Sequence, residues 1–191
     1  MKKFIKILTM FAMVLVLTTA CSQKADTNSA NQANQANQAS SKDPGTAKDG
    51  NEQKIETASM NLVNAVNKGG YELLSTEELN SWIEQKKDMI IIDTMPAKSF
   101  DKNRIPGAVN AELPVKAEEV KPEQKEAFIK ALGEDKNKTI VVYCGFVQCA
   151  RSDVGANIAK EAGFTNVYRQ PGGIVAWMDA GYTIEGSAAT K

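Results

Sequence analysis

The chain has 191 residues, 23 Lys and Arg against 23 Asp and Glu, three Cys and no His. The absence of His excludes Cys-His and Ser-His catalysis and His-ligated metal sites, and three Cys argue against a zinc site. Residues 72–186 hold 14 basic against 18 acidic residues, a net charge of −4, with no basic stripe. We therefore expect no nucleic acid partner.

Residues 1–20 have the pattern of a signal peptide. A basic start precedes an apolar stretch, Ile7 to Leu17, that is too short to span a membrane comfortably. The small residues directly before Cys21 resemble the lipobox of bacterial lipoproteins, which implies that Cys21 is lipidated. We therefore expect a lipid anchor that holds the protein at the extracytoplasmic face of the cell membrane. The alternative is an ordinary secretory signal with an incidental Cys, and both interpretations predict export.

A flexible, low-complexity tether is predicted over residues 21–60. This segment is poor in aromatic residues, and Asn-Gln-Ala occurs three times between Asn31 and Ala39, so it buries too little apolar surface to offset its ordering entropy. Apolar residues from Ile55 to Val66 recur with helical spacing, which predicts a helical lead-in reaching residues 61–70. One domain over 71–186 and a tail over 187–191 complete the chain.

Strand-like and helix-like segments alternate through this domain. Met89–Asp93 and Thr139–Tyr143 are continuous apolar runs, typical of parallel strands buried on both faces, and Ser75 with Glu78 forms a capping box. The alternation predicts an α/β fold, a mostly parallel central sheet flanked by helices, with the site beyond the carboxyl ends of the strands. The other expected elements are strands at 71–74, 108–113 and 166–169, and helices from Ser75, over 122–132, from about Val154 to Gly163, and over 174–180.

Cys144 occupies the most informative position in the chain. It directly follows the run Thr139–Tyr143 and opens a short loop that leads into a helix. Backbone N–H groups and the helix dipole favour an anion at such a place. We therefore expect a lowered pKa for the Cys144 thiol, which would make it a nucleophile.

A series of short motifs runs from the strand ending at Asp93 to the last helix: Ile91-Ile92-Asp93, Phe100, Ile105-Pro106-Gly107-Ala108-Val109-Asn110, Val141-Val142-Tyr143-Cys144, Arg151-Ser152, Ala162-Gly163-Phe164, Gly172-Gly173 and Trp177. In this order they resemble the rhodanese (thiosulfate sulfurtransferase) domain family. Two residues and the length of one loop differ from the family's usual pattern. Met95 replaces an Arg, Arg104 replaces a His, and six residues rather than five separate Cys144 from Arg151.

The resemblance implies a sulfurtransferase with a two-step reaction. The Cys144 thiolate would take the outer sulfur of thiosulfate, a polysulfide or a persulfide, and a thiol acceptor would then remove it. Arg151 would attract the small anionic donor, Arg104 is a further candidate for anion binding, and Asp93 is expected to accept loop hydrogen bonds as a structural residue. No metal or organic cofactor is needed. The residues expected to cradle the donor and the added sulfur are Gly145, Phe146, Val147, Gln148 and Ala150.

Cys149, separated from Cys144 by four residues in the same loop, is the unusual feature of this chain. Exported proteins rarely keep thiols that are neither paired nor used. Three roles are open: a catalytic thiol that resolves the Cys144 persulfide and leaves a disulfide, a structural or protective disulfide partner, or a small buried hydrophobe.

The sequence leaves more than one function open. A membrane-anchored sulfurtransferase is favoured. The alternatives are a non-enzymatic sulfur carrier, or a thiol/disulfide redox module that uses Cys144 and Cys149. A phosphatase or an arsenate-reductase-like enzyme is less favoured, because only Asp153 could be offered as the acid for a leaving group.

Overall fold

Five parallel strands form one sheet in the computed structural model, which describes residues 51–189. The predicted signal peptide (1–20), the lipidation site Cys21 and the tether up to residue 50 lie outside the described residues. The strands follow the order β1-β5-β4-β2-β3, so the expected parallel α/β fold is confirmed. Their bounds are β1 Glu72–Leu73, β2 Met89–Asp93, β3 Val109–Asn110, β4 Thr139–Tyr143 and β5 Val167–Arg169.

The two central strands match the sequence prediction, and the edge strands are shorter than predicted. β2 and β4 pair along their full length, from Met89 opposite Thr139 to Asp93 opposite Tyr143. At one edge only two residues of β1 pair with β5. At the other, the chain leaves the sheet after Asn110, and the amide of Leu113 bonds to the carbonyl of Thr94 beyond β2. Local strand propensity extends both runs further than their neighbours can pair with them.

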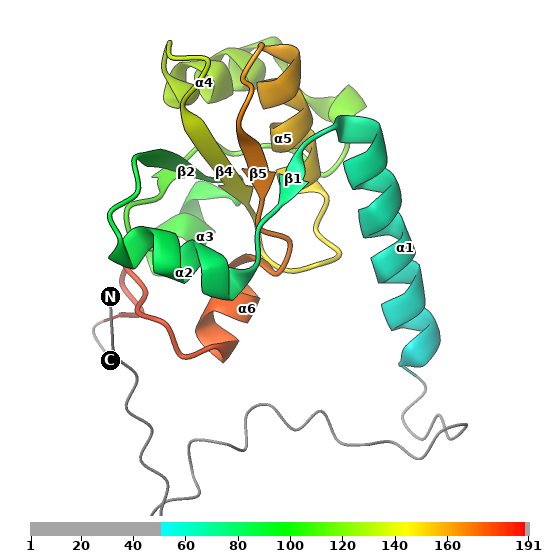
Figure 1. The fold of residues 1–191 in the computed structure, drawn as a ribbon, viewed down its shortest axis with the longest axis vertical. Coiled ribbons are helices and arrows are strands. Elements are labelled where there is room, and N and C mark those ends of the chain that lie inside the picture. Colours follow the sequence, from blue (N-terminus) through cyan, green and yellow to red (C-terminus); the bar gives the residue numbers. More distant parts are fainter. Residues whose placement is uncertain (1–50, 190–191) are drawn as a thin grey trace, which may run out of the picture. The chain divides into compact units, whose positions relative to one another are not determined.

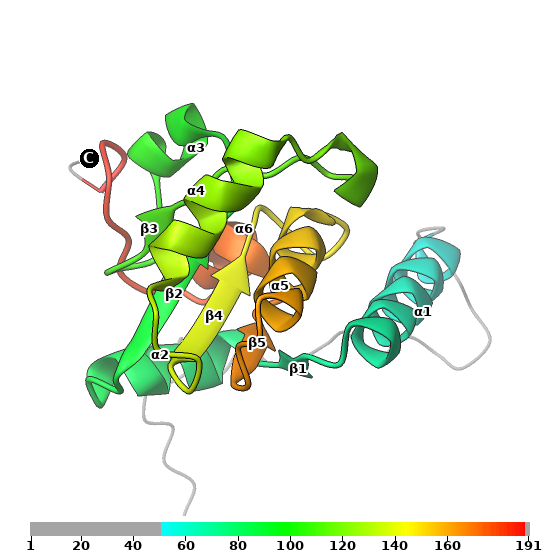
Figure 2. The same cartoon turned by 90° about the horizontal axis from the view of Figure 1, so that it is seen from above.

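Helices cover both faces of the sheet (Figures 1 and 2). α4 (Pro122–Leu132) and α5 (Arg151–Glu161) pack on one face, and α2 (Thr76–Glu84) and α6 (Gly173–Asp179) on the other. Ser75 caps α2 by accepting the amide of Glu78, as predicted. α3 (Ala97–Lys102) and a 3-10 turn (Ala117–Glu119) were not predicted, because neither is long enough to show helical periodicity.

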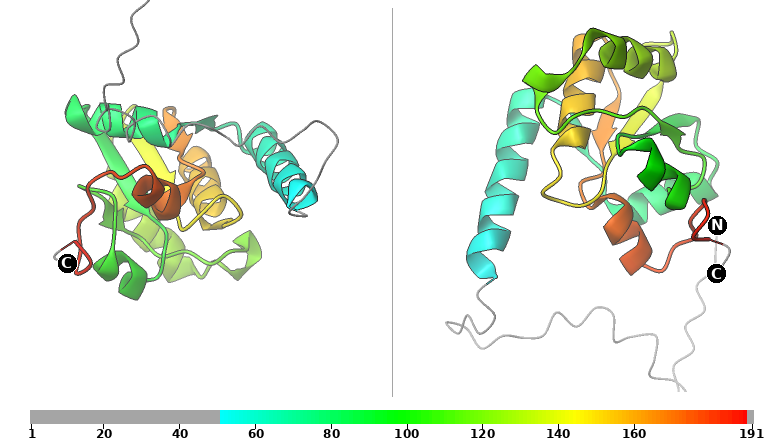
Figure 3. Two further views of the ribbon diagram at one scale, coloured as in Figure 1. Left: turned by 90° about the horizontal axis from the view of Figure 1, so that it is seen from below. Right: turned by 180° about the vertical axis from the view of Figure 1, so that it is seen from behind.

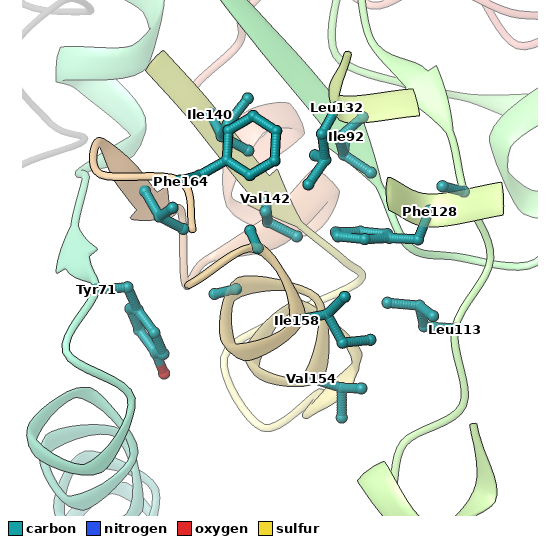
Figure 4. Packing of buried hydrophobic residues seen from close by; sticks show 14 residues of the cluster. Tyr71, Ile92, Leu113, Phe128, Leu132, Ile140, Val142, Val154, Ile158 and Phe164 are labelled. Atoms are coloured by element: carbon teal, nitrogen blue, oxygen red, sulfur yellow. The ribbon is translucent and has the colours of Figure 1, made fainter. Parts of the chain in front are cut away.

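The core between α5 and the sheet depends on a small residue in the helix. A Cβ on Gly155 would lie 3.0 Å from both Phe128 of α4 and Val142 of β4. The fully buried Phe128 ring and Val142 point toward α5, as Figure 4 shows. Gly155 therefore lets α5 approach β4 closely, and this brings the helix start near the end of the strand.

α1 (Glu52–Gly69) precedes the sheet and has no buried residue. It contacts α5, and Figure 3 shows it alongside α5 and the loop that follows β4. The helical spacing seen in the sequence is confirmed, but the tether boundary at residue 60 is wrong, since the helix already begins at Glu52. Only its first three residues, Glu52, Gln53 and Lys54, precede the apolar residue at which the pattern starts. Within residues 51–189 no helix is long and apolar enough to cross a membrane.

The parallel arrangement gathers three chemically active residues at one edge. Asp93 ends β2, Cys144 follows β4, and Arg169 ends β5. Because these strands are neighbours with the same direction, their carboxyl ends open onto one region. The candidate site is built there.

Candidate active site

The backbone of Cys144 is fixed by the start of α6. The amides of Ile174 and Val175 donate to the carbonyls of Cys144 and Gly145 at 2.9 and 3.0 Å. This close approach requires Gly173, which has φ 64° and whose Cβ, if present, would lie 2.4 Å from the Cys144 carbonyl oxygen. Gly172-Gly173 therefore does more than form a turn, because it holds the first residues of the loop in place.

The Cys144 thiol is completely buried and surrounded by polar partners. Its single proton has two acceptors on Cys149, the carbonyl oxygen at 3.1 Å and the sulfur. The Ser152 hydroxyl lies 3.2 Å from Cys144 Sγ, and the Ser152 amide donates to the same sulfur. Donation to Cys149 and desolvation together raise the pKa of Cys144 above its usual value. The lowered pKa that we expected for Cys144 is therefore wrong for this arrangement.

Cys149 has the environment that the sequence assigned to Cys144. Its sulfur accepts hydrogen bonds from the Cys144 thiol, from the amides of Gly145 and Arg151, and from the Arg151 side chain. The hydrogen bond from Cys144, followed by these amides, lowers the pKa of Cys149 to about 5 despite its burial. Both cysteines are free thiols, and Cys149 is 6 % exposed. Cys149 is buried, but it is hydrogen-bonded and not simply packed among apolar groups.

Arg151 is the first residue of α5, which begins three residues earlier than the expected start near Val154. The polar run Arg151-Ser152-Asp153 has no apolar periodicity, so the sequence did not reveal this first turn. Arg151 Nη1 lies 4.0 Å from Cys149 Sγ. Its Nε is buried and, among the described residues, has no hydrogen-bond partner. The guanidinium therefore has a donor free for an incoming anion.

Beneath the loop, Arg169 connects several elements. It is 3 % exposed, and its Nε donates to Ser152 Oγ at 2.9 Å while Nη2 donates to the Cys149 carbonyl at 3.2 Å. Nη1 donates to the Tyr71 hydroxyl at 3.3 Å. Tyr71 in turn donates to Asp153 at 2.5 Å, and burial together with this carboxylate raises the pKa of Tyr71 to about 12. Asp153 is thus engaged by Tyr71, which gives it a structural contact.

Asp93 accepts the loop hydrogen bond expected of it. The buried carboxylate accepts the amide of Met95 at 2.8 Å and the hydroxyl of Tyr143, which itself accepts the amide of Ile105 at 3.1 Å. Burial raises the pKa of Asp93 to about 6 against the opposing effect of these hydrogen bonds. The network joins the ends of β2 and β4 to the segment after α3.

The remaining predicted donor-binding residues lie on the outer side of the loop. Phe146 is 51 % exposed and, with Val147 and Gln148, lines a hollow of about 670 Å³. The opposite walls come from α1, including Ile55, and from α6, including Val175. Their side chains therefore form an apolar approach to the loop, and the Gly145 amide, not these side chains, contacts the Cys149 sulfur.

The sequence profile of the rhodanese-like domain matches residues 75–180, more than half of the chain and the whole of this loop. The chain belongs to the rhodanese-like domain family. Among curated proteins, none matches this sequence.

Several solved structures share this fold. A Bacillus halodurans protein is 21 % identical with a TM-score of 0.50, covering 68 % of this chain and 87 % of its own. A rhodanese-like domain from Anabaena is 21 % identical with a TM-score of 0.51, covering 62 % and 82 %. A thiosulfate sulfurtransferase from Pseudomonas aeruginosa is 20 % identical with a TM-score of 0.52, covering 64 % of this chain and 21 % of its own. At these identities the likeness shows the fold alone.

The structure shows where this rhodanese-like domain places its departures from the usual pattern. Met95 lies over the loop, since a Cβ on Gly145 would meet the Met95 sulfur at 3.4 Å. Arg104 pairs with Glu185 at 3.2 Å and covers the Phe100 ring. Its charge is already compensated, so the anion-binding role assigned to Arg104 remains a prediction that these contacts do not favour.

Sequence reasoning missed Arg169 as a functional residue. It was read only as the end of a strand, although a charged residue at the carboxyl end of a strand beside β4 is a usable signal. Ser152 was seen as part of a motif, without its contact to Cys144. Within residues 51–189 no group of three or more His, Cys, Asp or Glu is placed to hold a metal ion.

Proposed function

We propose that this protein is an extracytoplasmic sulfurtransferase that moves sulfane sulfur through a Cys144 persulfide to a thiol acceptor. The donor is thiosulfate, a polysulfide or a persulfide, and Cys21 carries the lipid that anchors the protein to the cell membrane. One observation carries the proposal. Two free thiols share a loop at the end of the central strand, facing backbone amides and the Arg151 guanidinium.

The chemistry of the donor fits this loop. Thiosulfate transfers its outer sulfur to a thiolate, the sulfur–sulfur bond breaks, and sulfite leaves with the electron pair. The free Nε donor of Arg151 would bind the sulfonate oxygens, and amides at the start of α5 would stabilise the charge on sulfur. An acceptor thiolate then attacks the outer sulfur of the persulfide and regenerates the protein thiolate.

A thiol/disulfide redox module is the second candidate. It is favoured by the hydrogen bond from the Cys144 thiol to the Cys149 carbonyl at 3.1 Å, which holds the two residues together within the loop. In that case a sulfur donor acts only as an oxidant, and the protein ends as a Cys144–Cys149 disulfide with release of sulfide. The two functions therefore differ in their products.

The function is tested with the full chain carrying Cys21→Ser, which leaves only the loop thiols. Treatment with thiosulfate should release sulfite and add one sulfur to the protein, and an added thiol should remove that sulfur. The double variant Cys144→Ser/Cys149→Ser is the control and should do neither. Sulfur transfer by the double variant would contradict the proposal, and a loss of two hydrogens in place of a gain of sulfur would support the redox module.

The anchor has a separate test. The unmodified chain should sediment with membranes when expressed in a bacterium, and Cys21→Ser should move it to the soluble fraction. An unchanged distribution would contradict lipidation at Cys21 without affecting the sulfur chemistry.

A further inference from the structure

We propose that sulfur enters the protein at Cys149 and is then passed inward to Cys144. This inference rests on the proposed sulfurtransferase function and assigns the two loop thiols separate steps. Cys149 attacks the external donor, and Cys144 receives the sulfur from Cys149. The direction of transfer is the reverse of a resolving role for Cys149.

The hydrogen bonds of the loop favour Cys149 as the first nucleophile. The amides of Gly145 and Arg151 both point at its sulfur, and the Arg151 guanidinium approaches the same atom at 4.0 Å. These are the groups that stabilise a thiolate and attract an anionic donor. Cys149 therefore occupies the place where such a donor would be bound.

Cys144 is poorly placed to react first. Its side chain is completely buried, and its proton is directed to acceptors on Cys149. Cys149 is 6 % exposed and Cys144 0 %, so a donor that enters from solvent meets the Cys149 side chain first.

The transfer steps balance without a further reagent. The Cys149 thiolate takes the outer sulfur of thiosulfate, and sulfite leaves with the electrons of the broken sulfur–sulfur bond. The Cys144 proton then moves to the terminal sulfur of the Cys149 persulfide. The Cys144 thiolate attacks that terminal sulfur, the bond to Cys149 breaks, and Cys149 departs as a thiolate while Cys144 carries the persulfide.

Thiol chemistry favours this direction. A thiol of lower pKa is the better leaving group, and a thiol of higher pKa is the stronger nucleophile once it is deprotonated. The amides directed at Cys149 lower its pKa, whereas burial and donation raise that of Cys144. Sulfur therefore leaves Cys149 more readily than it leaves Cys144.

Ser152 and Arg169 act as positioning residues for the inner thiol, Cys144. Arg169 Nε occupies a lone pair of the Ser152 hydroxyl, and an Arg can only donate. The Ser152 hydroxyl proton is consequently free to point at Cys144 Sγ, 3.2 Å away. Together with the Ser152 amide it would stabilise the Cys144 thiolate at the moment of transfer.

Single-turnover experiments with the Cys21→Ser chain show which of the two loop thiols takes the sulfur first. Each variant is mixed with thiosulfate, quenched at intervals with an alkylating agent, and mapped by peptide mass spectrometry. Cys144→Ser should release one equivalent of sulfite and hold the sulfur on Cys149, with no transfer to the inner position. Cys149→Ser should release sulfite at least about tenfold more slowly, because the remaining thiol is completely buried and the Arg151 guanidinium lies against position 149.

Wild-type protein gives the same information without altering the loop. The early persulfide should map to Cys149 and the later one to Cys144. First appearance on Cys144, or sulfite release from Cys149→Ser at the wild-type rate, would overturn the relay while leaving the sulfurtransferase function intact. Formation of a Cys144–Cys149 disulfide with sulfide release would overturn the inward step. No sulfite release from any form would instead refute the function itself.

Discussion

The two sides of the Cys144–Arg151 loop differ in how completely their polar groups are satisfied. On the inner side, Cys144, Ser152 and Arg169 are buried, and each has hydrogen-bond partners within the protein. On the outer side, Phe146 is half exposed and the buried Nε of Arg151 has no partner among the described residues. The inner side therefore behaves as part of the core, and the outer side retains the capacity to bind something else.

This difference predicts two kinds of mutant. Changes on the inner side should reduce the free energy of unfolding, because they leave buried polar groups without partners. Changes on the outer side should reduce the use of a donor with little effect on unfolding.

The largest loss is expected from Gly173→Ala. The new Cβ would meet the Cys144 carbonyl at 2.4 Å in a backbone with φ 64°, so we expect a loss of more than about 4 kcal/mol in unfolding free energy. Gly181→Ala is the matched control, since Gly181 has φ 75° but nothing lies within 4 Å of its Cβ position. Denaturant unfolding of both variants measures the difference. Equal losses would mean that strain at positive φ, and not the close contact with the Cys144 carbonyl, is the reason that position 173 requires glycine.

Arg169→Gln should cost about 3 to 4 kcal/mol in unfolding free energy, because it removes a buried cation from three hydrogen-bond partners. Arg169→Lys keeps the charge but not the planar fork, and we expect it to recover only part of the loss. Thermal or denaturant unfolding measures both. An Arg169→Gln protein as stable as the wild type would contradict the structural description of the inner side.

The features of the fold and the site that could be predicted from the sequence are those that depend on local contacts. The pairing of β2 with β4 and the capping of α2 by Ser75 were predictable, since continuous apolar runs and capping residues act within a few positions. The position of Cys144 at the strand end was predictable for the same reason.

The exchange of roles between the two thiols was not predictable from the sequence. It depends on where the six-residue loop places the Cys149 sulfur relative to the amides of Gly145 and Arg151. Likewise, the contact of Arg169 with Ser152 joins residues 17 positions apart across neighbouring elements. Such distances are set by helix and strand packing, which periodicity does not report.

Asp93 predicts a pH dependence that belongs to the inner side. Its pKa is raised to about 6 in the folded protein from an ordinary value of 3.8, so the folded state holds the proton more tightly than the unfolded chain does. Stability should therefore be greatest below about pH 4 for this group and fall by up to about 3 kcal/mol as the pH rises past 6. Asp93→Asn should remove that fall, measured as the difference between the two unfolding curves across pH. A constant difference at all pH values would contradict the raised pKa.

The smallest expected effect on stability, and the clearest on donor use, comes from Arg151→Ala. We expect thiosulfate use to fall about tenfold, because the guanidinium would donate a hydrogen bond to the thiosulfate anion. A neutral persulfide donor lacks this charge, so its loss should be smaller. Added salt should slow only the thiosulfate reaction of the wild type. Lys125→Ala, which removes an exposed cation paired with Glu161 on α4 and α5, is the charge-matched control. Equal losses for both donors would give Arg151 a structural role.

The pH dependence of alkylation at Cys144 and Cys149 is the sharpest test of whether the two loop thiols differ in ionisation. Iodoacetamide reacts with thiolates, and peptide mapping of the Cys21→Ser protein reports each cysteine separately. Cys149 should be modified first, with a midpoint near pH 5, while Cys144 stays unmodified in the folded protein at neutral pH. Modification of Cys144 before Cys149 would contradict the division of the loop into an inner, protonated thiol and an outer thiolate.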